Sequence, residues 1–421
     1  MKNLLIQSAK ILDHQSPFNG KLADVLIIEG KISRLEKKIS VSDKNTVIIS
    51  AKGQVLLPGF FDLNVNFGEP GLETKEDMGT GCMTAAAGGF TGLALMPNTQ
   101  PPIHSKAEVA YLISKSKNNL VDIHPLGCIS HNREGNELAE MYDMQQSGAI
   151  AFTDGNRPLS NAGLMSRALL YTKSFNGLIL SYPEDQDIAG KAKMNEGLMS
   201  TFLGMKGNPS LAEELMVSRD LYLAEYNDSR IHFSTISSAK SVDLIRKAKK
   251  TGIKVSCDVA VHHLIFTEDD LEGFDSNYKV KPPFRTKKDQ KALIAGLKDG
   301  TIDAIVSQHC PHEIEFKNVE FEIASYGIIG LQTALPVALK AGLSLDIILE
   351  KMAIAPRNIL GIAIPELKTG NSANFILINP EEVWELDEES NRSKSSNSPL
   401  LGKSLKGKVK LVYNNGQYII F

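Results

Sequence analysis

The chain has 421 residues, which suits one large barrel domain together with a smaller domain, or two to three ordinary domains. Hydrophobic residues make up 42% and charged residues 23%, with a net charge of −3, so the composition is that of a globular protein and gives no preference for nucleic acid or membranes. The start of the chain does not resemble a signal peptide, and no apolar run is long enough to span a bilayer, which predicts a cytoplasmic protein. The four cysteines form no CxxC pair, which predicts reduced thiols at Cys82, Cys128, Cys257 and Cys310.

Both ends of the chain are predicted to form strands. Short apolar runs separated by Gly or Asn turns fill residues 1–57, and the pattern returns in residues 366–421, where Asn415-Gly416 is a strong hairpin signal. We therefore expect a small β domain, a β-sandwich, built from 1–57 and 366–421. Within its second part, the polar segment 388–398 predicts a mobile, solvated loop.

The middle of the chain, residues 58–365, alternates apolar runs with helical patterns. Eight strand-like runs occur, at residues 55–67, 89–98, 121–129, 149–154, 177–184, 230–237, 253–264 and 304–312. Eight strand-then-helix repeats in about 300 residues are typical of an α/β fold of the (β/α)8 barrel type. A doubly wound open sheet is the alternative, but no Gly-rich dinucleotide-binding loop follows the first run.

Polar residues follow these predicted strands, and in a (β/α)8 barrel the chemistry lies at the carboxyl ends of the strands. The first strand ends with Asn64, Asn66 and Gly68, and the second with Asn98. The later strand ends carry Asp154, Ser181, Thr235, His262, His263, Gln308, His309 and His312. These side chains are the candidates for a functional site.

Seven segments resemble, in order, the motifs of dihydroorotases of the multifunctional-complex type, which belong to the amidohydrolase superfamily. They are residues 59–77, 93–103, 149–154, 259–271, 277–285, 300–312 and 324–336. The resemblance implies an amidohydrolase (β/α)8 barrel with a small β-sandwich. It also implies the reversible cyclisation of N-carbamoyl-aspartate to dihydroorotate in pyrimidine synthesis, with zinc as cofactor.

The metal-binding pattern of that family is not preserved. Family histidines fall at Asn64, Asn66, Ser181 and Thr235, and the proton-shuttling aspartate falls at Gln308, whereas the aspartate at Asp154 remains. Amide and hydroxyl oxygens are weak zinc ligands, and a neutral glutamine cannot act as a base near pH 7. We therefore expect no metal, no cofactor and no catalytic residues at these positions.

The substrate-binding pattern is altered in part. The family's arginine falls at Gly68 and an asparagine at Lys281, which offers a flexible positive charge. Positions matching ligand contacts persist at Asn98, His312, Tyr326 and Gly327.

Each candidate also has a purely structural interpretation. Asn98 is expected to cap its turn, and Asp154 to bond to Asn64 or Asn66. His262, His263 and His309 are expected to be structural, and a nucleophilic role for Ser181 lacks a strained elbow and a Ser–His–acid order.

Three functional hypotheses follow. The first is a non-catalytic assembly partner of the aspartate transcarbamoylase catalytic chain, since complex-type dihydroorotases associate with that enzyme and some members are inactive partners. The second is an active cyclic-amide hydrolase with an altered or metal-free site, and the third is a protein that binds a pyrimidine precursor without turnover. A homo-oligomer is expected in each case.

Overall fold

The computed structural model describes residues 3–43 and 45–421. Eight parallel strands form a nearly closed barrel, which confirms the predicted (β/α)8 fold. In chain order they are β6 (Phe60–Val65), β7 (Phe90–Leu95), β8 (Asp122–Gly127), β9 (Ala151–Phe152), β10 (Ile179–Ser181), β13 (Ile231–Phe233), β14 (Val255–Ala260) and β15 (Ala304–Val306). A parallel bridge between Val65 and His309 links the first strand to the segment after the last.

The barrel strands are buried on both faces, as parallel strands covered by helices should be. Alternate residues of one strand enter two different apolar clusters. In β7, Leu93 and Leu95 pack in the larger cluster, whereas Ala94 packs in a second cluster together with Ala304 and Val306 of β15. This continuous burial explains why the strands were visible in the sequence as uninterrupted apolar runs.

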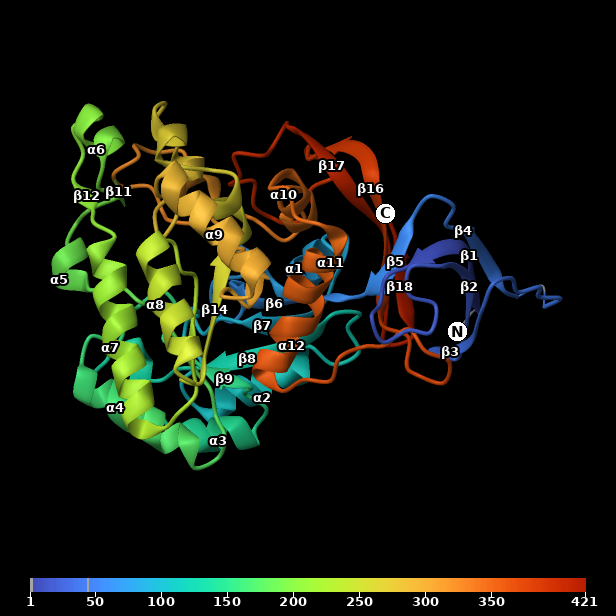
Figure 1. Cartoon of the computed structure of the whole chain (residues 1–421), viewed down its shortest axis with the longest axis horizontal. Coiled ribbons are helices and arrows are strands. Elements are labelled where there is room, and N and C mark those ends of the chain that lie inside the picture. Colours follow the sequence, from blue (N-terminus) through green and yellow to red (C-terminus); the bar gives the residue numbers. More distant parts are fainter. Residues whose placement is uncertain (1–2, 44) are drawn as a thin grey trace.

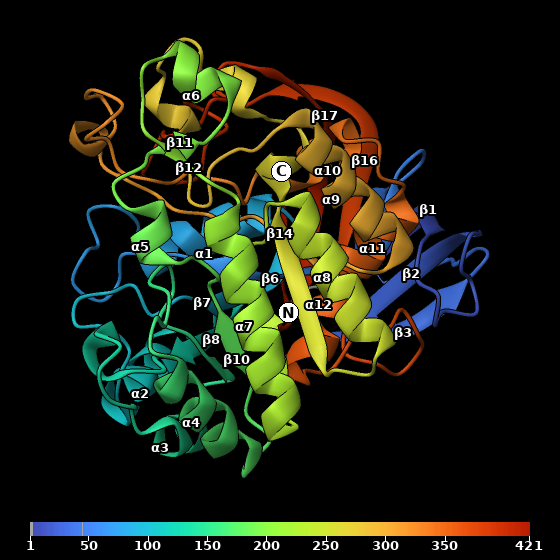
Figure 2. The same cartoon turned by 60° about the vertical axis from the view of Figure 1, so that its left-hand side comes forward.

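Helices cover the outside of the barrel (Figures 1 and 2). They are α1 (Met78–Ala87), α2 (Lys106–Lys115), α3 (Met141–Gln146), α4 (Ala162–Lys173), α5 (Gln186–Ala189), α6 (Leu198–Phe202), α7 (Leu211–Asn227), α8 (Ala239–Lys250), α9 (Lys287–Asp299), α10 (Ala334–Lys340), α11 (Leu345–Leu349) and α12 (Ala355–Leu360). Several begin at side-chain caps that the sequence dictates. Ser105 and Glu108 form a capping box at α2, and Thr286 and Asp289 form one at α9. Two short strands, β11 (Met194–Asn195) and β12 (Gly207–Asn208), pair beside α6.

A second sheet is built from both ends of the chain. It contains β1 (Leu4–Ile11), β2 (Leu22–Ile28), β3 (Lys31–Glu36), β4 (Val47–Ser50), β5 (Val55–Pro58), β16 (Phe375–Glu385), β17 (Ser404–Asn414) and β18 (Gln417–Ile420). The antiparallel pair β5–β16 joins the two halves. Asn415 and Gly416 both adopt positive φ between β17 and β18, so the predicted hairpin is confirmed. The domain boundaries at residues 57/58 and 365/366 stay a prediction.

Within the described residues, no helix is both long enough and apolar enough to cross a membrane. All four cysteines are free, and burial raises the pKa of each thiol, to about 12 for Cys82.

Candidate functional site

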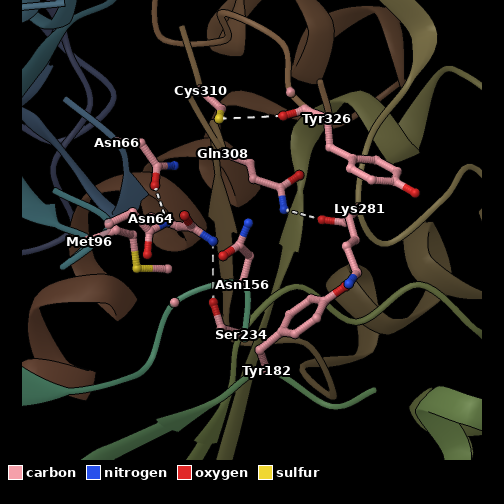
Figure 3. Close-up of a pocket in the computed structure, with 13 residues that line it drawn as sticks. Asn64, Asn66, Met96, Asn156, Tyr182, Ser234, Lys281, Gln308, Cys310 and Tyr326 are labelled. Atoms are coloured by element: carbon pink, nitrogen blue, oxygen red, sulfur yellow. Dashed lines mark hydrogen bonds between the residues drawn. The ribbon is translucent and has the colours of Figure 1, made fainter. Parts of the chain in front are cut away.

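A pocket opens at the carboxyl ends of the barrel strands (Figure 3). Seven of the twelve predicted site positions line it, namely Asn64, Asn66, Asn98, Lys281, Gln308, Tyr326 and Gly327. The other lining residues are Met96, Gly155, Asn156, Tyr182, Ser234 and Cys310, which the sequence analysis did not single out. The remaining five predicted positions, Gly68, Asp154, Ser181, Thr235 and His312, lie outside the lining.

Asparagine side chains occupy the end of β6, where they bond to their neighbours. Because side chains alternate along a strand, Asn64 and Asn66 point to the same side. Asn64 Nδ2 donates to Thr235 Oγ1 at 3.2 Å and to Ser234 Oγ at 3.3 Å. Asn66 Nδ2 donates to the His309 carbonyl at 3.0 Å. The amides at these two positions are therefore committed to protein–protein hydrogen bonds.

Asn98 belongs to the same amide network, which corrects its predicted role as a turn cap. Its Nδ2 donates to Asn66 Oδ1 at 2.6 Å. Its Oδ1 is buried and has no hydrogen-bond partner among the described residues. The turn after β7 directs this side chain into the pocket, a direction that the sequence position alone does not fix.

Asp154, the one retained acidic position, is committed elsewhere. Its carboxylate accepts hydrogen bonds from the backbone amides of Ile129 and Ser130, at 2.9 and 3.0 Å, and from Ser130 Oγ at 2.5 Å. Burial raises the pKa of Asp154. The predicted bond from Asp154 to Asn64 or Asn66 is wrong, because the carboxylate instead holds the loop that follows β8.

Ser181 and Thr235 each bond to a buried aspartate that the sequence analysis missed. Ser181 Oγ donates to Asp220 Oδ2 at 2.7 Å, and Asp220 pairs with Arg219 at 2.7 Å. The backbone amide of Thr235 donates to Asp258 Oδ1 at 2.6 Å, and Asp258 also contacts His232 Nε2 at 2.9 Å. Ser181 is therefore bonded to an acid and not to a histidine, so it is not part of a Ser–His–acid triad.

The backbone at two of the altered positions is left-handed. Thr235 has φ +61° and Gln308 has φ +49°, values that are costly for non-glycine residues and most costly for a β-branched one. Gln308 Nε2 donates to the Lys281 carbonyl at 2.9 Å. The backbone at the pocket is therefore strained at Thr235 and Gln308, although the side chains of these two residues are neutral.

Lys281 brings no free positive charge to the pocket. Its Nζ pairs with Glu184 Oε1 at 2.7 Å, and Glu184 is almost fully buried. The other carboxylate oxygen of Glu184 accepts from Asn208 Nδ2 at 3.2 Å. Because the ion pair neutralises Lys281, the prediction that this residue replaces the missing arginine charge is not supported.

Gly68 and His312, the two other predicted positions outside the pocket lining, contact backbone carbonyl groups. A Cβ at Gly68 would lie 1.7 Å from the Leu72 carbonyl oxygen, so the loop closes against this glycine where an arginine was expected from the family pattern. His312 Nε2 donates to the Tyr326 carbonyl at 2.9 Å, and burial lowers the pKa of His312 to about 4. Neither residue presents a charge to the pocket.

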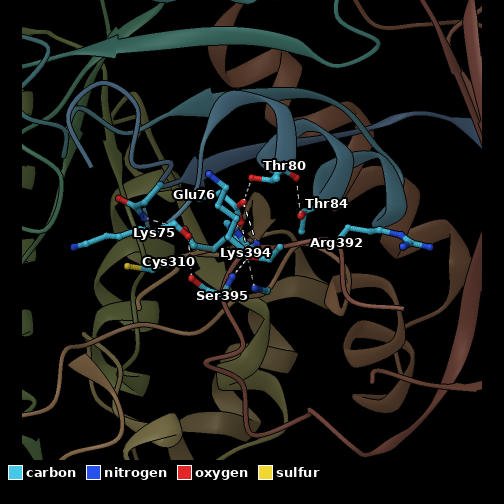
Figure 4. A network of polar contacts seen from close by, with 12 residues as sticks. Lys75, Glu76, Thr80, Thr84, Cys310, Arg392, Lys394 and Ser395 are labelled. Atoms are coloured by element: carbon cyan, nitrogen blue, oxygen red, sulfur yellow. Dashed lines mark hydrogen bonds and ion pairs between the residues drawn. The ribbon is translucent and has the colours of Figure 1, made fainter. Parts of the chain in front are cut away.

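The segment 388–398, which we call the strap, is not the solvated loop that its composition predicts (Figure 4). Lys394 Nζ pairs with Asp77 at 2.5 Å, and Ser393 Oγ and the Lys394 amide both donate to Glu76. Asn397 is buried, donates to the carbonyls of Cys310 and Gly327 at 2.9 and 3.0 Å, and accepts from the His312 amide at 3.1 Å. The strap therefore ties the loop that contains Glu76 and Asp77 to the segments that contribute Cys310 and Gly327 to the pocket wall.

The three histidine positions expected to be structural are buried. The His262 ring meets Phe284 edge-on and the His263 ring packs against Phe284 at a tilt, and burial lowers the pKa of His263 to about 3. His309 lies 3.5 Å from the buried Glu76 carboxylate, beneath the strap. These contacts agree with a packing role.

The residues at the pocket do not fit a zinc ion. Zinc sites in proteins use at least three His, Cys, Asp or Glu ligands. Over residues 3–43 and 45–421, no three such side chains come close enough to share a metal. The amide and hydroxyl groups of the pocket are poor substitutes, and they already bond to one another.

The comparisons with known proteins agree with the motifs. A family model described as dihydro-orotase-like matches residues 53–241. The dihydroorotase of Acetivibrio thermocellus is 42% identical over 423 residues, and that of Geotalea daltonii is 40% identical over 422 residues, with 99% of each chain covered in both cases. The solved L-hydantoinase (dihydropyrimidinase) from Arthrobacter aurescens shares the fold, with a TM-score of 0.85 at 23% identity over 100% of this chain and 96% of that chain. Because curated dihydroorotases align with nearly all of it at this level of identity, the chain belongs to the dihydroorotase family of the amidohydrolase superfamily.

Proposed function

We propose that this chain is a dihydroorotase-family protein of pyrimidine biosynthesis that does not catalyse the family's reaction and serves as an assembly partner of aspartate transcarbamoylase. One observation carries the first half of the proposal. The family resemblance places metal-binding histidines at Asn64 and Asn66, and both amides already bond to the protein: Asn64 donates to Ser234 and Thr235, and Asn66 donates to the His309 carbonyl and accepts from Asn98. Because the barrel is intact and its site lacks the groups for catalysis, we infer that the protein acts through its molecular surface.

The pocket chemistry supports the absence of turnover. Hydrolysis of a cyclic amide needs an activated water, and the pKa of free water lies far above neutrality, whereas zinc lowers the pKa of a bound water to about 7. The groups that reach the pocket as acids or bases are few. Lys281 is paired with Glu184, and Gln308 is neutral; burial raises the pKa of Tyr326 to about 12 and also raises the pKa values of Tyr182 and Cys310. No group there is poised to take a proton from water near pH 7.

The alternative is an active cyclic-amide hydrolase with an altered site. The relatives favour it, because proteins 42% and 40% identical to this chain are named dihydroorotases. A second alternative, binding of a pyrimidine precursor without turnover, is favoured by the buried, unpartnered Asn98 Oδ1, which is free to accept from an N–H group.

The decisive experiment assays the purified protein in both directions, with dihydroorotate and with N-carbamoyl-aspartate, after growth with added zinc. The Acetivibrio thermocellus dihydroorotase, prepared in parallel, is the positive control. We expect well under one zinc per chain and no turnover above the buffer rate. Turnover that survives repurification would overturn the proposal, whereas calorimetric binding of dihydroorotate without turnover would favour the precursor-binding alternative.

The assembly role needs a separate test. The chain is mixed with the transcarbamoylase catalytic chain of the same organism and analysed by co-purification and light scattering. A specific stable interface should bury about 1,200 Å² or more in total. Gln308→Ala should leave the complex intact, because this side chain lies in the pocket and not on the outer surface. If no complex elutes and the transcarbamoylase keeps its size and activity, the assembly role is rejected.

A further inference from the structure

The charge of the pocket depends on one ion pair, between Lys281 and Glu184. Lys281 is the only charged side chain among the thirteen residues that line the pocket, all of them within the described part of the chain. Its Nζ lies 2.7 Å from Glu184 Oε1 and 5.7 Å from the centroid of the Tyr182 ring. Figure 3 shows the Lys281 side chain extending towards Tyr182 and away from Asn64 and Asn66. The lining therefore presents no uncompensated charge to a ligand.

Glu184 is held in the position from which it neutralises Lys281. It follows β10, its side chain is 7% exposed, and it lies outside the pocket lining. Its second carboxylate oxygen accepts from Asn208 Nδ2 at 3.2 Å and from the Tyr182 hydroxyl at 3.4 Å. A buried carboxylate is costly unless it is paired and hydrogen-bonded, so these contacts stabilise the ion pair in this place. Without the charge of Glu184, Lys281 would be an unpaired cation in the pocket wall.

The other cations near the pocket do not line it. Lys279 and Lys317 are buried, and the hydrogen bonds of their ammonium groups go to backbone carbonyl groups. Lys193 lies over the Tyr326 ring, 5.6 Å from its centroid, and is outside the lining as well. His312 is uncharged near pH 7, because burial lowers its pKa to about 4. A carboxylate bound in the pocket would therefore lack a cation to pair with, and its burial there would be unfavourable.

One wall of the pocket offers an acceptor and a donor that are both uncharged. Asn98 Oδ1 is a buried acceptor without a hydrogen-bond partner among the described residues. It lies beside Gly155, where a Cβ would come within 2.0 Å of it. The next residue, Asn156, accepts from Arg133 through its Oδ1 at 2.8 Å, and its Nδ2 makes no hydrogen bond within residues 3–43 and 45–421. A ligand at this wall is therefore met by one amide oxygen and one amide N–H group.

These groups match a neutral cyclic ureide or imide. In such a ring an N–H donor and a C=O acceptor adjoin in one plane, as the amide pair of the wall requires. A ligand N–H that reaches Asn98 Oδ1 makes the hydrogen bond that the protein leaves unmade, and an unpaired buried acceptor is costly. Met96, Tyr182 and Tyr326 also line the pocket and supply apolar and aromatic surface for the faces of a flat ring.

We propose that Glu184 sets the charge preference of the pocket, so that the pocket binds a neutral cyclic ureide or imide and discriminates against the carboxylate-bearing ligand that the family resemblance implies. Glu184 is a positioning residue, because it contacts Lys281 and lies outside the pocket lining. The inference rests on the proposed absence of catalysis and is independent of the assembly role. Dihydrouracil and dihydroorotate are the matched probes, since they differ only by a carboxylate group.

Isothermal titration calorimetry of the full chain with each probe gives the first test. We expect dihydrouracil to bind at least ~10-fold more tightly than dihydroorotate, because a buried carboxylate without a partner opposes binding. Liquid chromatography of the recovered probe shows whether its ring has been opened. Tighter binding of dihydroorotate, equal binding of the two probes, or binding of neither would overturn the proposal. This test uses the wild-type protein and so does not depend on whether a variant folds.

The variant Glu184→Gln tests whether this residue sets the preference. Glutamine keeps the size of the side chain and frees the Lys281 charge. The dissociation constant of dihydroorotate should therefore fall at least ~10-fold, whereas that of dihydrouracil should change less than ~3-fold. The double variant Glu184→Gln/Lys281→Gln is neutral again and should return dihydroorotate to its wild-type affinity. Glu196→Gln, the same substitution at an exposed residue outside the lining, should change neither affinity.

The outcomes separate this proposal from the proposed function. If Glu184→Gln keeps the wild-type circular dichroism but weakens both probes in parallel, Glu184 has a structural role only and the proposal fails. Ring opening of dihydrouracil in preference to dihydroorotate would refute the absence of catalysis and support the charge preference. Ring opening of dihydroorotate in preference to dihydrouracil would refute both. Intact probes that bind in the expected order support both.

Discussion

We expect the substitution Gly68→Arg to destabilise the protein. It should not restore an arginine side chain that binds a carboxylate group. A Cβ at this position would lie 1.7 Å from the Leu72 carbonyl oxygen and 2.9 Å from that of Glu76, where ordinary contact begins at 3.4 Å. The same groups hold the loop, because the Gly68 amide donates to Glu76 at 2.8 Å and the Leu72 amide donates to Gly68 at 2.7 Å. To accommodate a side chain at position 68, the loop must therefore move and break both hydrogen bonds.

The expected cost follows from these contacts. Each lost backbone hydrogen bond removes about 1 kcal/mol, and overpacking a fitted segment costs about 1–3 kcal/mol. We expect Gly68→Arg to lower the free energy of unfolding by about 3–5 kcal/mol, a large share of the ~5–15 kcal/mol that native proteins have.

Urea denaturation followed by circular dichroism measures this difference. Gly273→Arg is the matched control, because nothing lies within 4 Å of a Cβ at Gly273 and its backbone is not left-handed. The control should unfold near the wild-type midpoint. If Gly68→Arg unfolds at the same urea concentration as the control, the loop is pliable. Position 68 would then accept a side chain, contrary to this prediction.

Three further predictions concern the pocket and the strap. The double variant Asn64→His/Asn66→His should gain neither stoichiometric zinc nor dihydroorotate turnover, since the other ligands and the proton shuttle stay absent. Elemental analysis measures the zinc, and the assay in both directions measures the turnover. A clear gain of zinc or of turnover would contradict the prediction. Burial lowers the pKa of His312 to about 4, so between about pH 6.5, the ordinary histidine value, and pH 4 the unfolded chain binds a proton that the folded chain does not. Stability should fall as the pH falls through that window, and His312→Gln should make the fall shallower in denaturation curves; parallel curves would contradict the burial effect. Asn397→Ala removes three hydrogen bonds of the strap, which should lower the free energy of unfolding by about 2–3 kcal/mol. Proteolysis within residues 388–398 should become faster. An unchanged cleavage rate would mean that other contacts hold the strap in place.

The fold was accessible from the sequence because its signals are local. A strand buried on both faces must be apolar throughout, so each of the eight runs in residues 55–312 marked one barrel strand. The hairpin at Asn415-Gly416 was equally visible, since few residue pairs tolerate two positive φ angles in succession. The replacement of metal ligands at Asn64 and Asn66 was also a property of the sequence alone, because it depends on residue type and not on placement.

Only the tertiary structure decided which polar groups meet. Composition made the strap look solvated, yet Asn397 and Ser395 are buried because backbone carbonyls from distant loops need their donors. Asp220 and Asp258 gave no signal in the sequence, and their bonds to Ser181 and Thr235 depend on helix and strand packing. Residue type thus carries the prediction that the site lacks the family's metal chemistry. The pairing of buried donors and acceptors joins residues far apart in the chain, and only the tertiary structure decides it.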